Sequence, residues 1–334
     1  MRDDRTIKAD GLGPADQRIQ WFGEQFRAIR DRVEEAVKGK THVVDLSLVC
    51  LVAEGHLLIE DVPGVGKTTL ARALAAALNL EWTRVQFTPD LLPSDITGVS
   101  IFHQGRQEFE FRPGPAFTNI LVADEINRAS PKTQSALLEV MEERQITVDG
   151  TPRPTPRPFL VVATQNPIEL EGTYRLPEAQ LDRFLVRVGL GYPDAASEKG
   201  LYAAAGPERL TDTLRPVASA QVVEGLIGVA AEVTVPDAVL AYIHALVVAT
   251  RDDERVRLGA SPRAGIGLVR AAQARAAADG RRYVLAEDVV ALAGPVLGHR
   301  LILEPDARVQ GLDGADLVQA VIEATPAPVP AATP

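Results

Sequence analysis

Apolar positions near the start of the chain follow a helical spacing, and those that come next follow the spacing of strands. Phe22, Phe26, Ile29, Val33 and Val37 recur at steps of four and three residues, which predicts an amphipathic helix. From about residue 40 to 190, short apolar runs alternate with helical patterns. The predicted strands cover residues 57–60, 83–87, 120–124, 159–164 and 185–190. Several runs are apolar throughout, as in parallel strands buried on both faces, so we predict an α/β sandwich with right-handed crossover helices.

Two interruptions of this alternation predict β-hairpins. Residues 99–111 alternate around Gln104 and Gly105, and residues 145–158 contain a second candidate that turns at Asp149 and Gly150. The returning arm of the second hairpin, residues 151–158, has proline at every second position. Proline cannot donate to a sheet ladder, so this arm is not expected to form a central strand.

The last third of the chain predicts a small helical domain, because strand signals fade from about residue 211 to 308. The expected helices cover residues 221–230, 236–249, 261–279 and 286–294. Ser261 followed by Pro262 is a favourable helix start, with serine at the N-cap and proline at the first helical position. Gly280 is the expected stop. Residues 324–334 are rich in Ala and Pro, and we expect them to be disordered.

Composition limits the class of protein. The chain has 334 residues and a formal net charge of −10, which disfavours non-specific binding to nucleic acid. Cys50 is the only cysteine and lies in an apolar run, so we expect an inert buried thiol. No apolar stretch approaches the ~20 residues of a membrane span, and the charged N-terminus does not resemble a signal peptide. These features predict a soluble, cytoplasmic protein.

A glycine loop between a predicted strand and a predicted helix carries the strongest chemical signal. Gly64, Gly66, Lys67 and Thr68 stand at that junction, where backbone N–H groups can bind phosphate oxygens. Lysine can reach the β- and γ-phosphates of ATP, and threonine can hold Mg²⁺. The strict pattern requires Gly where Asp61 stands, and the alternative interpretation is a Gly-rich turn with a surface lysine. The residues predicted to bind ATP here are Pro63, Gly64, Val65, Gly66, Lys67, Thr68 and Thr69.

The strand predicted at residues 120–124 ends in two acids, which is typical of a Walker B motif. Asp124 is expected to hold Mg²⁺, often through water, opposite Thr68, and Glu125 to polarise the attacking water. Alone, such a strand end is a weak signal whose alternative is a solvated carboxylate pair. The five histidines show no metal-binding spacing, so we predict no metal other than nucleotide-bound Mg²⁺.

Four segments together resemble the MoxR family of AAA+ ATPases. They read DVPGVGKTTLARALA, ILVADEINRASPKTQSALLEVMEERQITVDG, VVATQNPIE and YRLPEAQLDRFLVRV. The resemblance covers residues 20 to 310 and implies a P-loop AAA+ parallel-sheet sandwich with β-hairpin inserts and a small all-α lid. The implied domains are a flexible segment 1–18, an α/β nucleotide-binding domain 19–210, a helical lid 211–310 and an Ala/Pro-rich tail 311–334.

The resemblance also implies roles for residues outside the two nucleotide motifs. Asn166 matches sensor 1, which orients water near the γ-phosphate, although an Asn-Pro turn is the simpler alternative. Arg183 matches the arginine finger, which faces the ATP of a neighbouring subunit; its alternative is a salt-bridged helix end. Arg263 resembles sensor 2 of the lid, and whether it acts on its own subunit or the next stays open. Arg128 is either an interface residue or a structural cap.

The activity that the resemblance implies is ATP hydrolysis coupled to chaperone-like remodelling or maturation of a partner complex. It implies a homo-oligomer, expected as a hexameric ring, and a separate partner with a von Willebrand factor A domain. The hairpin phenylalanines are expected to pack by default, with contact to substrate as the alternative. A nucleic-acid-directed motor and a slow ATP-dependent switch or scaffold remain alternatives, and a P-loop small-molecule kinase is least favoured.

Overall fold

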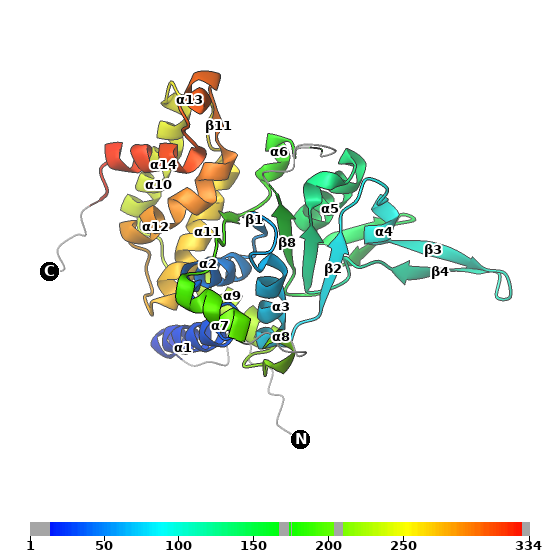
Figure 1. The fold of residues 1–334 in the computed structure, drawn as a ribbon. Coiled ribbons are helices and arrows are strands. Elements are labelled where there is room, and N and C mark those ends of the chain that lie inside the picture. Colours follow the sequence, from blue (N-terminus) through cyan, green and yellow to red (C-terminus); the bar gives the residue numbers. More distant parts are fainter. Residues whose placement is uncertain (1–13, 167–173, 175, 204–209, 329–334) are drawn as a thin grey trace.

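The core of the protein is a five-stranded parallel sheet with the order β2-β5-β8-β1-β9 (Figure 1). The computed structural model describes residues 14–166, 174, 176–203 and 210–328. The strands are β1 (Leu57–Glu60), β2 (Trp82–Gln86), β5 (Ile120–Asp124), β8 (Leu160–Gln165) and β9 (Val186–Val188). The predicted strands and the predicted α/β fold class are therefore confirmed. The carboxyl ends of all five strands meet at one edge of the sheet.

Helices cover both faces of this sheet. Along β1, Leu57 and Ile59 face one hydrophobic cluster and Leu58 faces another, because successive side chains of a strand point to opposite faces. The first cluster packs against α1 (Ala15–Glu34), α2 (Thr41–Val52), α3 (Lys67–Leu78) and the lid. The second packs against α4 (Pro93–Thr97) and α5 (Pro131–Glu143). The buried residues of α1 include four of the five that predicted it, at positions 22, 26, 29 and 33.

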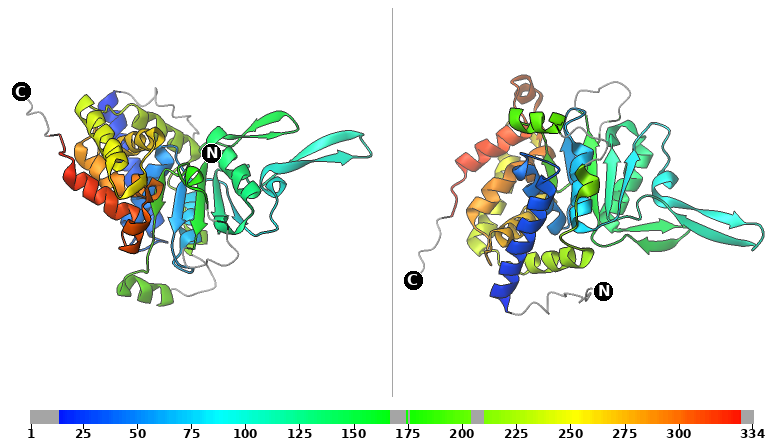
Figure 2. Two further views of the ribbon diagram at one scale, coloured as in Figure 1. Left: turned by 90° about the horizontal axis from the view of Figure 1, so that it is seen from above. Right: turned by 60° about the horizontal axis from the view of Figure 1, so that its bottom comes forward.

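Both predicted hairpins are present as separate two-stranded sheets. Strand β3 (Gly98–His103) pairs antiparallel with β4 (Glu108–Pro113), and β6 (Gln145–Val148) pairs with β7 (Thr151–Pro154). The two hairpins project from the same side of the core (Figure 2). On the longer one, the rings of Phe102 and Phe109 lie 5.1 Å apart, and Phe109 is still 73% exposed. Of the three hairpin phenylalanines predicted to pack, Phe102 and Phe109 pack only against each other, whereas the Phe111 ring packs against Phe117 at 5.6 Å.

The C-terminal part is a helical lid beside the sheet (Figure 1). Its main helices are α9 (Ala220–Ala231), α10 (Asp237–Asp252), α11 (Pro262–Ala278), α12 (Ala286–Leu297) and α14 (Gly314–Ala324). The lid also contains α13 (Pro305–Val309), β10 (Val256–Leu258) and β11 (Ile302–Leu303). Three short helices precede α9 in the chain, namely α6 (Glu178–Leu181) between β8 and β9, α7 (Ala195–Ala203) and α8 (Leu210–Thr213). Ser261 caps α11 as predicted, since its Oγ accepts a hydrogen bond from the Ala264 N–H at 3.2 Å.

The structure differs from the sequence analysis at both ends of the chain, where helices occupy part of the segments predicted to lack structure. The predicted tail 311–334 contains α14, which begins with a capping box at Asp313 and buries Leu317, Val318 and Val321 against the lid. The sequence analysis missed this helix because an Ala/Pro-rich segment follows it directly and raised the proline content of the whole tail. Of the predicted flexible segment 1–18, residues 1–13 lie outside the described part of the chain, and Ala15 already begins α1. Within the described residues, no helix is long and apolar enough to cross a membrane.

Candidate functional site

The glycine loop lies at the carboxyl edge of the sheet, between the end of β1 and the start of α3. Gly64 and Gly66 have φ of +87° and +98°, a conformation that side chains rarely adopt. A Cβ placed on Gly64 would meet no atom within 4 Å, so the space above the loop is open. Lys67 Nζ donates hydrogen bonds to the carbonyl oxygens of Asp61 at 2.5 Å and Gln165 at 3.2 Å. The loop therefore has the form of a phosphate cradle.

Asp61, the one departure from the strict loop pattern, has a structural explanation. Its Oδ1 accepts a hydrogen bond from the Val62 N–H at 2.8 Å, and its Oδ2 accepts one from the Gly191 N–H at 2.6 Å. These bonds tie the start of the loop to the segment that follows β9. The carboxylate thus anchors the loop from outside, and the glycines at 64 and 66 retain the left-handed turns.

A cavity of 370 Å³ adjoins the loop and was not predicted from the sequence. It is lined by Pro63, Gly64, Val65, Gly66 and Thr69 on one side and by residues of two distant segments on the other, namely Ala36, Val37, Lys38, Lys40, Tyr192, Pro193, Ser197, Glu198 and Tyr202. Aromatic and apolar side chains next to a phosphate cradle suit a nucleotide base. No local motif signals this cavity, because its walls come from three separate parts of the chain.

Asp124 and Glu125 lie at the same edge, each held by polar neighbours. Asp124 is buried, and its Oδ1 accepts from the Thr164 hydroxyl at 2.5 Å while its Oδ2 accepts from Arg84 Nη2 at 2.6 Å. Glu125 has φ of +55°, and its Oε2 accepts from Gln86 Nε2 at 2.7 Å and Arg128 Nη1 at 2.8 Å. Its backbone N–H also donates to Thr164 Oγ1 at 2.9 Å. The two acids are therefore fixed in separate orientations.

Arg84 and Gln86 were missed by the sequence analysis, although the sequence contains a signal for them. They stand two positions apart on β2, so they share one face of that strand, and β2 pairs with the strand that ends in Asp124. Asn166 follows β8 directly and is buried. Since β8 lies between β5 and β1, Asn166 stands between the two acids and the glycine loop. The structure therefore brings Lys67, Asp124, Glu125 and Asn166 together at one edge.

The donors at this edge suit a magnesium ion bound together with phosphate. Within the described residues, no group of three or more His, Cys, Asp and Glu side chains could hold a metal by itself. Mg²⁺ in nucleotide sites typically needs one or two protein carboxylates, with phosphates and waters completing its coordination. The Thr68 hydroxyl and the Asp124 carboxylate are hard oxygen donors of that kind. The residues therefore fit Mg²⁺ as a companion of a bound nucleotide.

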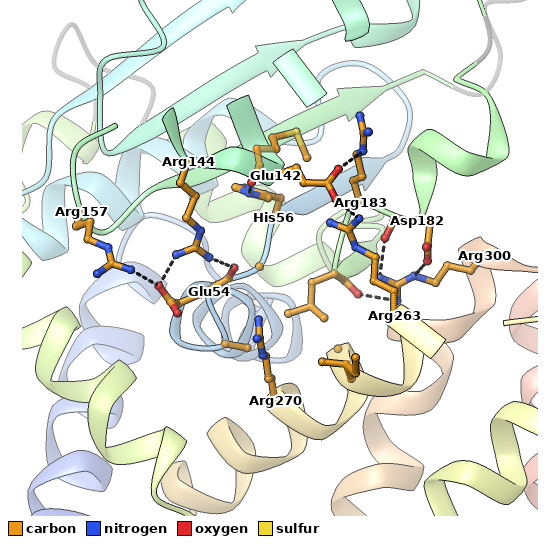
Figure 3. A pocket seen from close by; sticks show the side chains of 16 residues that line it. Glu54, His56, Glu142, Arg144, Arg157, Asp182, Arg183, Arg263, Arg270 and Arg300 are labelled. Atoms are coloured by element: carbon orange, nitrogen blue, oxygen red, sulfur yellow. Dashed lines mark hydrogen bonds and ion pairs between the residues drawn. The ribbon is translucent and has the colours of Figure 1, made fainter. Parts of the chain in front are cut away.

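Arg183 and Arg263 lie elsewhere, at the opposite edge of the same sheet. They line a cavity of 400 Å³ together with Gly55 and His56, which come directly before β1 (Figure 3). Arg183 Nε and Arg263 Nη1 each lie 2.9 Å from an oxygen of Glu142, at the end of α5. The glycine loop follows the other end of β1. The predicted site residues thus form two groups, separated within one chain by the length of the strands.

The second group is strongly basic. Six arginines line the cavity against three acids, Glu54, Glu142 and Asp182. Arg144 is paired with Glu54, and Arg157 also approaches Glu54 at 3.4 Å (Figure 3). The excess of positive charge in an open cavity suits an anion with several charged oxygens. The sequence analysis found two of these arginines, and the others carry no local motif.

Comparisons with known proteins agree with both parts of the fold. Residues 56–186 match the profile described as "ATPase family associated with various cellular activities (AAA)", and residues 248–321 match "AAA lid domain". The chain is 47% identical to Bacillus subtilis protein YeaC, covering 90% of this chain and 93% of that protein. It is 41% identical to Mycobacterium tuberculosis chaperone MoxR1, covering 90% and 82%. A crystal structure of a Cytophaga hutchinsonii protein superposes with a TM-score of 0.87 at 36% identity, covering 94% and 98%.

Proposed function

This chain belongs to the MoxR family of AAA+ ATPases, and we propose that it hydrolyses ATP to ADP and phosphate at a site completed by a second copy of itself. The observation that carries the proposal is the division of the site residues between two edges of the sheet. Arg183 and Arg263 face a basic cavity on the edge opposite the chain's own cradle. An arginine so placed can reach a γ-phosphate only if that phosphate belongs to a neighbour.

The cradle edge of one chain would hold ATP and activate water. Lys67 and the N–H groups of the glycine loop bind the phosphates, and residues of the adjoining cavity surround the base. Glu125, held by Gln86 and Arg128, orients the attacking water, and Asn166 positions it beside the γ-phosphate. Thr68 and Asp124 would hold Mg²⁺, which supplies charge neutralisation on the β- and γ-oxygens when bound.

The arginine edge of the next chain would stabilise the charge that develops during phosphoryl transfer. A guanidinium keeps its charge at every physiological pH, and its planar fork matches phosphate oxygens. Arg183 and Arg263 each use one nitrogen on Glu142, which leaves other N–H groups for phosphate. In this arrangement Arg263 acts on the neighbour's nucleotide, together with Arg183, rather than on its own.

We further propose a hexameric ring that remodels a partner complex, working with a separate von Willebrand factor A domain protein. Support comes from the named relatives, one of which is called a chaperone. The exposed pair Phe102 and Phe109 on the projecting hairpin is the surface we assign to partner contact. The net charge of −10 disfavours the alternative of a nucleic-acid-directed motor.

The test is the ATPase rate measured against protein concentration, with the mass of the assembly determined in parallel. We expect the specific activity to rise as the oligomer forms, because each site needs two chains. A second arm mixes Arg183→Ala subunits with Glu125→Gln subunits. In a ring of random composition, about a quarter of the interfaces then pair an intact Glu125 with an intact Arg183, and activity should return to that level. Constant activity from a monomer, with no return on mixing, contradicts the proposal.

A further inference from the structure

A buried arginine of the lid donates hydrogen bonds to the loop that carries Arg183. Arg300, at the end of a short 3-10 helix after α12, has only 4% of its side chain exposed. Its Nη2 donates to the carbonyl oxygens of Asp182 at 3.1 Å and Phe184 at 2.8 Å, which flank Arg183 in the chain. Its Nε lies 2.8 Å from Asp182 Oδ1 (Figure 3). One guanidinium thus holds both sides of the predicted finger.

The same loop is bound a second time, at the start of the helix that carries Arg263. Ser261 Oγ donates to the Asp182 carboxylate at 3.0 Å, and Ser261 is the N-cap of α11. His299, beside Arg300, has its Nε2 3.0 Å from the Phe184 carbonyl oxygen. Two separate elements of the lid therefore contact Asp182 and Phe184, the residues on either side of Arg183.

We propose that Arg300 is a positioning residue for the arginine finger: with Asp182 it fastens the 182–185 loop to the lid, so that Arg183 and Arg263 are presented as one unit. The inference rests on the proposed function, in which both arginines act on the neighbour's ATP. The inference adds a structural reason why Arg183 and Arg263 lie side by side. Glu142 contacts the tips of the two side chains, whereas Arg300 and Asp182 fix the backbone from which they extend.

Arginine is specifically suited to this role. Its Nη groups donate to carbonyl oxygens of the finger loop and to the Val296 carbonyl oxygen, while its charge pairs with the Asp182 carboxylate. Burial lowers the pKa of Arg300 to about 10, partly offset by Asp182, so the group stays charged at neutral pH. Lysine would keep the charge but cannot bridge several acceptors in fixed directions. Methionine would fill much of the volume with no donors.

The experiment measures ATPase kinetics of Arg300→Lys and Arg300→Met in the full chain. A matched control is Arg281→Met, which removes a partly buried arginine bound to Asp279 and Asp288, both within the lid. We expect Arg300→Met to lower kcat by about 10- to 100-fold, the range expected for a misplaced catalytic group, with KM for ATP within about twofold. Arg300→Lys should fall between Arg300→Met and the unmodified chain. Arg281→Met should leave kcat near its original value.

Subunit mixing separates positioning of the finger from a general loss of structure. Arg300→Met mixed with Glu125→Gln should regain activity to the level of the Arg183→Ala and Glu125→Gln pair, because the two defects lie on different sides of an interface. Arg300→Met mixed with Arg183→Ala should regain none. Activity can return when Arg183→Ala is mixed with Glu125→Gln but not when Arg300→Met is mixed with Glu125→Gln. That outcome leaves the proposed function standing and shows that this inference is wrong.

A second readout does not depend on the ring. Hydrogen exchange of the peptide covering residues 181–187 should be faster in Arg300→Lys and Arg300→Met than in Arg281→Met. If the Arg183→Ala and Glu125→Gln pair itself fails to regain activity, the proposed function is wrong. Faster hydrogen exchange in the Arg300 variants would then still support the attachment of the 182–185 loop to the lid by Arg300, and unchanged exchange would overturn it.

Discussion

Arg183 and Arg263 bind the two oxygens of one carboxylate, that of Glu142, each at 2.9 Å. The first arginine comes from the loop before β9 and the second from the lid helix α11. Two guanidinium groups so close to each other would repel, and the carboxylate between them offsets that repulsion. All three side chains remain partly exposed, so the pairing is accessible to solvent and to a neighbouring chain.

Replacing Glu142 should disturb both arginines together. We expect Glu142→Gln to lower kcat by about tenfold with KM for ATP within about twofold, because the amide no longer holds two cations in one place. The matched control is Glu143→Gln, the neighbouring exposed glutamate, which should have no effect. Steady-state ATPase assays check this, and unchanged kcat in Glu142→Gln would show that the shared carboxylate is dispensable.

Arg263 should act on the nucleotide of the next chain. We expect Arg263→Ala to be inactive alone and to regain about a quarter of the original activity when mixed equally with Glu125→Gln, because one interface in four is then complete. Mixed with Arg183→Ala it should stay inactive, since both defects lie on the same side. Rescue by Arg183→Ala subunits and not by Glu125→Gln subunits would place Arg263 at its own chain's site.

Lys67 should be required for nucleotide binding. Its Nζ is held by two carbonyl oxygens beside the open space of the loop, where it can turn toward a phosphate. We expect Lys67→Ala to weaken ATP binding by about 10- to 100-fold, the range for a charged hydrogen bond. Calorimetric titration with ATP checks this, with Lys132→Ala on the exposed face of α5 as control. Affinity equal to that of the control would refute the assignment of the cradle.

Arg84 should compete with magnesium for Asp124. Its guanidinium contacts Asp124 Oδ2 through both Nε at 3.0 Å and Nη2 at 2.6 Å. Removing a positive charge so close to the carboxylate should strengthen its attraction for a cation. We expect Arg84→Met to lower the Mg²⁺ concentration for half-maximal ATPase by about three- to tenfold. The control is Arg112→Met, which replaces an exposed arginine of the longer hairpin. A higher Mg²⁺ concentration for half-maximal ATPase in Arg84→Met would contradict the assignment of Asp124 to magnesium.

His56 should make stability depend on pH. Burial lowers its pKa to about 4, and its Nδ1 accepts a hydrogen bond from the Val161 N–H that protonation would break. The unfolded chain takes up this proton near pH 6.5, so acid favours unfolding. The contribution is complete above about pH 6.5 and falls by on the order of 3 kcal/mol as the pH approaches 4.

Denaturant unfolding between pH 4 and pH 7 measures this dependence. His56→Gln should flatten the slope without abolishing it, because the buried His299 also has a pKa lowered by burial and acts in the same direction. His244→Gln, at an exposed position, should leave the slope unchanged. An equal slope in His56→Gln and the original chain would contradict the prediction.

Much of the fold was accessible from the sequence, because its signals are local. A strand buried on both faces is apolar at successive positions, and a glycine loop before a helix can be recognised within eight residues. The strands, the hairpins, the N-cap at Ser261 and the clustering of Lys67, Asp124 and Glu125 at one edge all follow from such patterns. The helix α14 was missed because the prolines that follow it dominated the composition of the segment.

Other features depend on which segments the tertiary structure brings together. Arg263 and Arg183 meet on Glu142 only because the lid packs against the edge where β1 and β9 begin. Arg300 reaches the finger loop, and Arg84 reaches Asp124, through contacts between segments far apart in sequence. Residue type and spacing determined by themselves that this chain has a phosphate cradle, an acidic strand end and a helical lid. Only the folded chain decided which edge each arginine faces, because long-range packing leaves no periodic trace in the sequence.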